Sequence, residues 1–158
     1  MSMPDRAYPA HPLLAASVAV IRDGRVLLAT RRKPPAEGLF SLPGGLVEAG
    51  ETLEGAALRE LGEEVGVTAS IVAFNDHVEV IERDGEGKVA RHFVIASFVA
   101  RWVSGQGQPS AEAGRVIWAK PAEIEALPTT CGLSRVVARA FRVLEANALA
   151  GKVRREHL

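Results

Sequence analysis

The chain has 158 residues, 47% of them hydrophobic and 24% charged, which is the composition of one globular domain and excludes the disordered and fibrous classes. Lysine plus arginine and aspartate plus glutamate both number 19, so the composition provides neither a basic field for nucleic acid nor an acidic tail. The single Cys131 excludes an intramolecular disulfide. Because the sequence also holds no Cys/His zinc cluster, we expect a reducing, cytoplasmic environment.

The N-terminal stretch 1–12 contains three prolines and no long apolar run. It therefore predicts a flexible arm rather than a signal peptide or a membrane-spanning helix. We expect a single domain over 13–150, followed by a C-terminal tail over 151–158. No apolar stretch approaches the roughly 18 to 20 residues that cross a membrane, so no membrane partner is expected.

Asp23-Gly24 lies between two apolar runs and predicts a β-hairpin, because glycine accepts the positive φ that a tight turn requires. This hairpin joins strands near 14–22 and 25–31. Further along we expect a short strand within 39–42, strands at 70–83 and 90–103 that form a second hairpin, a strand at 115–120, a helical turn at 121–127 and a helix that carries the apolar stripe of 133–144.

The apolar period changes after Thr52. Leucine, alanine and valine then recur at three- and four-residue steps, which predicts an amphipathic helix over 52–64. Thr52 can cap the start of this helix, and Gly66 can close it in a left-handed conformation. Strands that precede and separate only two main helices indicate an α+β fold, with a mixed β-sheet between the helices.

Three glutamates crowd one sector of this helix. Glu60 and Glu64 share a face and Glu63 borders it, and each like-charge pair costs roughly 0.2 to 0.5 kcal/mol in an isolated helix. One interpretation is a solvated acidic face. The other is a site for a hard divalent cation, because converging carboxylates bind such ions together with substrate phosphates. Gly44 and Gly45 precede the helix and favour the second interpretation, since their backbone can approach an ion or phosphate closely.

Arg59 lies eight residues from Glu51, close to two helical turns away. It can reach back along the helix axis, anchor Glu51 and fix the glycine-rich loop on the helix. The alternative is an ordinary surface arginine.

The spacing of these residues resembles the signature of the Nudix hydrolase family without departure. The matching positions are Gly45, five residues, Glu51, seven residues, Arg59-Glu60-Leu61, one residue, Glu63-Glu64, one residue, and Gly66-Val67. The resemblance implies an α/β/α sandwich and Mg²⁺- or Mn²⁺-dependent hydrolysis of a nucleoside diphosphate linked to another group.

The resemblance also implies roles for individual residues. Glu60, Glu63 and Glu64 resemble the metal ligands, with the Gly44 carbonyl as a further ligand. Arg59 and Glu51 resemble the pair that orients the helix and the loop. Glu60 also matches the position that acts as general base in some members of the family, whereas others use a glutamate from a distant loop.

Candidate residues outside the signature come from two loops. Arg31 and Arg32 end a strand immediately before the glycine-rich loop, where they and Gly45 can meet substrate phosphates; the alternative is a solvated strand end. Glu112 lies in a loop ahead of a strand and is the best candidate for the distant carboxylate that joins the metal site. For Glu112 the competing interpretation is a surface residue.

The expected substrate is a small nucleotide, with ADP-ribose or a related sugar nucleotide as the first hypothesis. The alternatives are a nucleoside triphosphate, including an oxidised one, and a sensor module that binds nucleotide without turnover. The segment "VIERDGEG" at 80–87 holds neither the proline nor the tyrosine that marks two substrate branches of the family. Nucleic acid is not an expected partner, and the resemblance is compatible with a homodimer.

Overall fold

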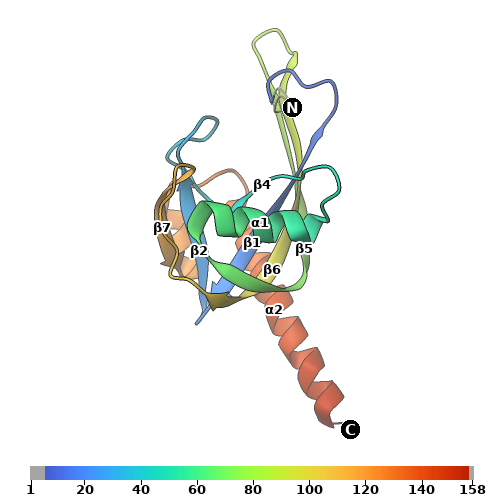
Figure 1. Ribbon diagram of the computed structural model, residues 1–158, viewed down its shortest axis with the longest axis vertical. Coiled ribbons are helices and arrows are strands. Elements are labelled where there is room, and N and C mark those ends of the chain that lie inside the picture. The colour runs from blue at the N-terminus through green and yellow to red at the C-terminus, as the bar shows by residue number, and fades with distance from the viewer. Residues whose placement is uncertain (1–5, 157–158) are drawn as a thin grey trace.

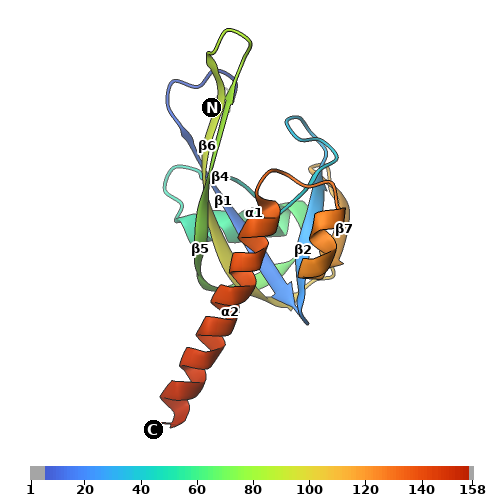
Figure 2. The ribbon, with the colours of Figure 1, turned by 180° about the vertical axis from the view of Figure 1, so that it is seen from behind.

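The computed structural model describes residues 6–156, so residues 1–5 of the expected arm and residues 157–158 of the expected tail lie outside the described part. A β-sheet lies between helix α1 (Leu53–Val65) and helix α2 (Leu133–Glu156), as Figure 1 and the reverse view of Figure 2 show. The remaining elements are β1 Leu13–Arg22, β2 Arg25–Arg31, β3 Phe40–Ser41, β4 Gly44–Leu46, β5 Thr68–Arg83, β6 Val89–Ser104, β7 Ala113–Ala119 and the short 3-10 helix η1 Pro121–Ala126.

Within residues 6–156 the sheet has seven strands, in the order β3-β2-β1-β6-β5, with β4 paired to β1 and β7 paired to β2. The long β1 and β6 run parallel, from Leu13 beside Phe93 to Ile21 beside Arg101. The other pairings are antiparallel. The predicted α+β fold with a mixed sheet between two helices is confirmed.

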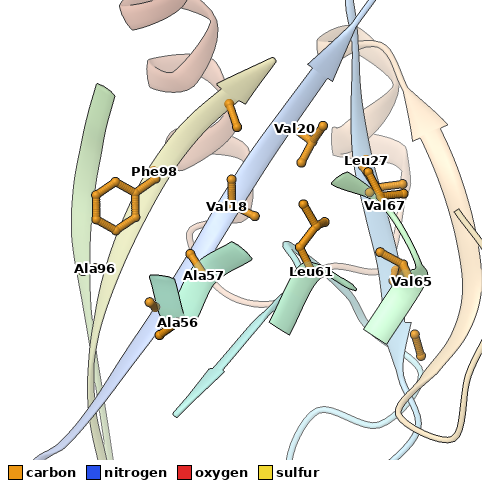
Figure 3. Close-up of a cluster of buried hydrophobic side chains, with 14 residues drawn as sticks. Val18, Val20, Leu27, Ala56, Ala57, Leu61, Val65, Val67, Ala96 and Phe98 are labelled. Atoms are coloured by element: carbon orange, nitrogen blue, oxygen red, sulfur yellow. The ribbon is translucent and has the colours of Figure 1, made fainter. Parts of the chain in front are cut away.

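Side chains of the central strand β1 point alternately to the two faces of the sheet, so the core has two layers. Val18 and Val20 of β1 pack toward Leu61 of α1, as Figure 3 shows. Their neighbours Ala19 and Ile21 point to the opposite face and belong to the cluster beneath α2. Because side chains of a strand alternate between the two faces, β1 buries both and reads as a continuous apolar run.

Local signals predicted the turns and caps correctly. Asp23 and Gly24 have φ values of 49° and 72°, and Arg22 pairs with Arg25 across the turn. Thr52 accepts a hydrogen bond from the Gly55 N–H at 3.0 Å and so caps α1. Gly66 closes the helix in the left-handed conformation, with φ 66°.

Strand β4 was not predicted, because the Gly44-Gly45 stretch has no side chains that alternate in polarity. The structure pairs Gly44 with Ser17 and Gly45 with Ala16. A Cβ atom added to Gly44 would lie 2.4 Å from the Ala16 carbonyl oxygen and 2.8 Å from the Ser17 Cα. The missing side chain is therefore what lets this segment lie against β1.

Both chain ends are structured where they are described, and the domain bounds 13–150 stay a prediction. Helix α2 continues through Glu156, so no break in secondary structure separates 151–156 from the residues before it. At the other end, Tyr8 contacts the β5–β6 hairpin, so the described part of the arm is held rather than loose. No helix among residues 6–156 is long and apolar enough to cross a membrane.

The close contact at Gly44 generates a prediction about stability. Gly44→Ala should destabilise the fold by about 1–3 kcal/mol, because the new methyl group meets backbone atoms that cannot rotate away. The matched control is Gly62→Ala in α1, where an added Cβ has nothing within 4 Å. That control should be about 0.5–1 kcal/mol more stable than the wild type, because alanine favours a helix interior. Urea unfolding midpoints measure both changes, and equal midpoints for wild type and Gly44→Ala would contradict the packing argument.

Candidate active site

Arg59 joins helix α1 to the loop that precedes it. Its Nε donates to Glu51 Oε2 at 2.7 Å, and its Nη2 donates to Glu51 Oε1 at 2.8 Å. Nη2 also donates to the Leu46 carbonyl oxygen at 3.1 Å. A planar guanidinium can make such a two-pronged contact with a carboxylate, and a lysine cannot. The predicted anchor between Arg59 and Glu51 is therefore confirmed.

Arg59 and Glu51 each stabilise the charged form of the other. Hydrogen bonds from Arg59 and then from the Glu48 N–H lower the pKa of Glu51 to about 2. The Glu51 carboxylate in turn raises the pKa of the Arg59 guanidinium. Both groups therefore stay charged at neutral pH, and the loop remains tied to the helix.

Three carboxylates, two of them from α1, converge beside this contact between Arg59 and Glu51. Oxygens of Glu60, Glu64 and Glu112 all lie within 4.8 Å of one another. Glu60 and Glu64 come from adjacent turns of the helix, and Glu112 comes from the loop before β7. This loop is held in place because the Arg32 N–H donates to the Glu112 carbonyl oxygen at 3.2 Å.

Without a cation, this convergence is unfavourable. The pKa of Glu64 is raised to about 8, mainly by burial and then by the charges of Glu60 and Glu112, while a Gly44 N–H hydrogen bond and the Arg31 charge partly oppose the rise. Burial likewise raises the pKa of Glu60, against the hydrogen bond from Arg59. A divalent cation would offset both the burial and the mutual repulsion, so this donor set fits a hard metal ion.

The glycine-rich strand closes over the acidic cluster. A Cβ atom added to Gly45 would lie 2.5 Å from the Glu60 carboxyl carbon, so only glycine allows the backbone to approach this carboxylate. Glu60 is accordingly only 13% exposed. Gly44, next to it, lines the same cavity.

Glu63 is not brought into the cluster. Its side chain is 59% exposed, and its Oε2 accepts a hydrogen bond from Arg59 Nη1 at 3.1 Å. The cause is helical spacing: Arg59 lies four residues before Glu63 and attracts it along the helix surface. That Glu63 is a metal ligand therefore stays a prediction.

The predicted phosphate-binding arginines line the same cavity as the carboxylates. This cavity has a volume of about 810 Å³, and its walls include Arg31, Arg32 and Glu112. Arg31 Nε donates to the Pro35 carbonyl oxygen at 2.9 Å, and Arg32 Nε donates to the Ala113 carbonyl oxygen at 3.2 Å. These bonds use one donor of each guanidinium and orient the group. The cavity thus combines a cation-binding cluster with anion-binding side chains.

Arg6 is a charged residue of the cavity wall that the sequence analysis did not identify. Arg6, from the N-terminal arm, also lines the cavity. No local pattern could have indicated it, because its position depends on contacts between the arm and a hairpin more than 75 residues away, at Asp84.

Comparison with known proteins agrees with this geometry. The chain is 37% identical over 127 residues to a MutT-like protein of Streptomyces ambofaciens, a match that covers 78% of the chain and 75% of that protein. It is 33% identical over 96 residues to an ADP-ribose pyrophosphatase of Methanocaldococcus jannaschii, a match that covers 61% of the chain and only 54% of that protein. The NUDIX domain of Shewanella oneidensis NrtR, solved in complex with ADP ribose, superposes with a TM-score of 0.69 at 26% identity and covers 85% of the chain and 89% of that domain.

The sequence model of the NUDIX domain matches residues 11–140, which include β1 to β7, α1 and the first part of α2. Of the signature positions, Gly45, Arg59, Glu60 and Glu64 line the cavity, and Glu51 binds Arg59 in the contact that we call the Arg59 clamp. The chain therefore belongs to the Nudix hydrolase family, a group of hydrolases that act on phosphoric anhydrides.

Proposed function

We propose that the chain is a Mg²⁺- or Mn²⁺-dependent pyrophosphohydrolase that cleaves the diphosphate of a nucleoside diphosphate-linked substrate. The observation that carries this proposal is the convergence of Glu60, Glu64 and Glu112 within 4.8 Å, in a cavity that Arg31 and Arg32 also line. A cluster of carboxylates alone would favour a cation. Carboxylates and arginines in one cavity favour a cation together with phosphates.

ADP-ribose or a related sugar nucleotide is the first substrate to test. Support comes from the relative named as an ADP-ribose pyrophosphatase and from the similar NUDIX domain that was solved with ADP ribose. The cavity volume of about 810 Å³ is in the range of pockets that hold a ligand of this size. Water would attack one phosphorus atom, and the bridging P–O bond would break to give AMP and ribose 5-phosphate.

The proposed roles follow from the contacts. A bound divalent ion would neutralise charge on the phosphoryl oxygens and acidify the attacking water. Glu60 and Glu64 would hold the ion, with Glu63 and the Gly44 carbonyl as further proposed ligands. Arg31 and Arg32 would orient the phosphates through their remaining guanidinium donors.

A carboxylate at the water is needed to accept a proton. We assign this role to Glu112, because it belongs to the cluster but sits on an exposed loop that water can reach. Glu60 is the alternative base, yet it already accepts a hydrogen bond from Arg59 at 3.0 Å and packs against Gly45. We assign Arg59 and Glu51 as positioning residues, because their mutual contact orients the loop relative to the helix.

A substrate panel tests this function. ADP-ribose, other sugar nucleotides, deoxynucleoside triphosphates and oxidised dGTP are each incubated with and without Mg²⁺, and the products are identified. Metal-dependent release of AMP and ribose phosphate would support the proposal. Release of a nucleoside monophosphate and pyrophosphate would assign triphosphates instead, and nucleotide binding with no turnover of any substrate would favour a sensor module.

Metal binding should stabilise the folded protein. At a Mg²⁺ concentration of about 100 times Kd, mass action contributes about 2.7 kcal/mol, which corresponds to a rise in Tm of about 5–10 °C for a chain of this length. Glu60→Gln combined with Glu64→Gln should abolish the rise, because two carboxylates of the cluster are then neutral. Glu145→Gln on the exposed part of α2 is the matched control. A full Mg²⁺-dependent rise in the double variant would refute the metal assignment.

The raised pKa of Glu64 predicts how metal-free stability depends on pH. Between the ordinary pKa of glutamate, near 4.5, and about 8, the folded state binds more protons at Glu64 than the unfolded state does. The free energy of unfolding therefore falls as pH rises through this window. In chelator, the Tm of Glu64→Gln should increasingly exceed that of the wild type from pH 5 to pH 8.5. A Tm difference that stays constant over this range would show that Glu64 titrates normally.

If the Arg59 clamp acts through its geometry, a lysine at this position should not restore catalysis even though it carries the same charge. Arg59→Lys keeps the positive charge but loses the two-pronged contact with Glu51 and the bond to the Leu46 carbonyl. The loop and the cluster should then be misplaced relative to each other, and kcat should fall by about 100-fold. Arg135→Lys, in an exposed pair with Asp76, is the control and should leave kcat unchanged. Wild-type kcat in Arg59→Lys would contradict a geometric role for the clamp.

A further inference from the structure

The N-terminal arm delivers a positive charge to the cavity from outside the sheet and the helices. Arg6 is exposed and forms part of the cavity wall, together with side chains that lie 23 or more residues further along the chain. No carboxylate within residues 6–156 pairs with it. A charged side chain at a cavity wall with no carboxylate partner in this described part of the chain is placed to meet a charged ligand.

A set of contacts at Tyr8 holds the arm in this position. The Tyr8 N–H donates to the Ala90 carbonyl oxygen at 2.9 Å, and the Tyr8 hydroxyl donates to Asp84 Oδ2 at 3.0 Å. The Lys88 ammonium lies 4.7 Å from the centre of the Tyr8 ring. We call these contacts the Tyr8 anchor. They fasten the arm to the turn of the β5–β6 hairpin, which projects beyond the body of the molecule with the arm beside it (Figures 1 and 2).

The anchor is specific rather than a chance surface contact. Asp84 also accepts hydrogen bonds from the N–H groups of Glu86 and Lys88, at 2.9 and 3.0 Å, so its carboxylate is fixed before it meets Tyr8. Tyr8 has a positive φ of 50°, which is unfavourable for a residue with a side chain. A strained residue persists only where surrounding contacts determine its conformation. The anchor supplies such contacts two residues from Arg6.

The charge distribution in the cavity indicates what Arg6 would bind. The acidic cluster of Glu60, Glu64 and Glu112 suits the cation, and Arg31 and Arg32 come from the end of β2 next to it. Arg6 enters from a different element, so it can reach a part of the ligand that these two arginines do not hold. The guanidinium fork matches the oxygens of a phosphate.

On the basis of the proposed function, we propose that Arg6 is a substrate-binding residue that contacts a phosphate group of the nucleotide, and that the Tyr8 anchor positions it. The class of ligand is a compound with at least two linked phosphates. Arg6 contributes binding rather than chemistry, since it lies outside the carboxylate cluster. Loss of the residue and loss of its anchor should therefore have the same consequence.

Steady-state kinetics with ADP-ribose and Mg²⁺ test the proposal. Arg6→Ala should raise KM about tenfold, the loss of one charge-assisted hydrogen bond, with kcat within twofold of the wild type. Tyr8→Ala should raise KM similarly, and the double variant should be no worse than either single variant. Arg154→Ala at the far end of α2 is the matched control and should leave KM unchanged. A wild-type KM in Arg6→Ala, or fully additive effects of the two substitutions, would overturn the proposal.

Equilibrium binding separates this inference from the proposed function. Titration calorimetry of ADP with Mg²⁺ measures Kd whether or not any substrate is hydrolysed. A tenfold higher Kd in Arg6→Ala than in wild type and Arg154→Ala supports the role of Arg6, even if ADP-ribose is not cleaved. Equal Kd values, or no binding of ADP to the wild type, would refute it.

Discussion

The contact of the Arg59 guanidinium with Glu51 and with the Leu46 carbonyl is the interaction on which the rest of the site depends. It joins three segments that are separate in the chain: the end of β4, the loop before α1, and α1 itself. Because one planar group binds both oxygens of Glu51, the loop has a single orientation relative to the helix. The same guanidinium reaches Glu60 and Glu63 through Nη1, so the clamp also sets the position of the acidic sector.

The two glycines of β4, Gly44 and Gly45, have no side chains and so let this strand approach its neighbours closely. Gly44 lies against the backbone of β1, and Gly45 lies against the carboxylate of Glu60, in each case closer than any residue with a Cβ could come. The consequence is electrostatic, because burial raises the pKa of both Glu60 and Glu64, and the charge of Glu112 raises both further. The protein thus accepts an unfavourable charge cluster in its folded state. Such a cluster is understandable if a cation completes it.

Sequence reasoning succeeded where structure is determined locally. The caps of α1 at Thr52 and Gly66, the turn at Asp23-Gly24 and the reach of Arg59 to Glu51 all depend on spacing within a few helical turns or one hairpin. It failed where distant segments meet. Strand β4 forms by pairing with β1, and the arm that carries Arg6 is held by the contact of Tyr8 with Asp84 in a distant hairpin turn. Glu63 lines the cavity and accepts a hydrogen bond from Arg59, and its role as a metal ligand stays a prediction. Glu112, named from the sequence as a candidate loop carboxylate, lies beside Glu60 and Glu64.

Anomalous diffraction from a crystal soaked in Mn²⁺ is the sharpest test of the proposed divalent-cation site at Glu60, Glu64 and Glu112. We expect an anomalous peak within coordination distance of carboxylate oxygens of Glu60 and Glu64, between α1 and the loop that carries Glu112. No peak in this cavity at a saturating Mn²⁺ concentration, or a peak only at other carboxylates, would refute the proposed site.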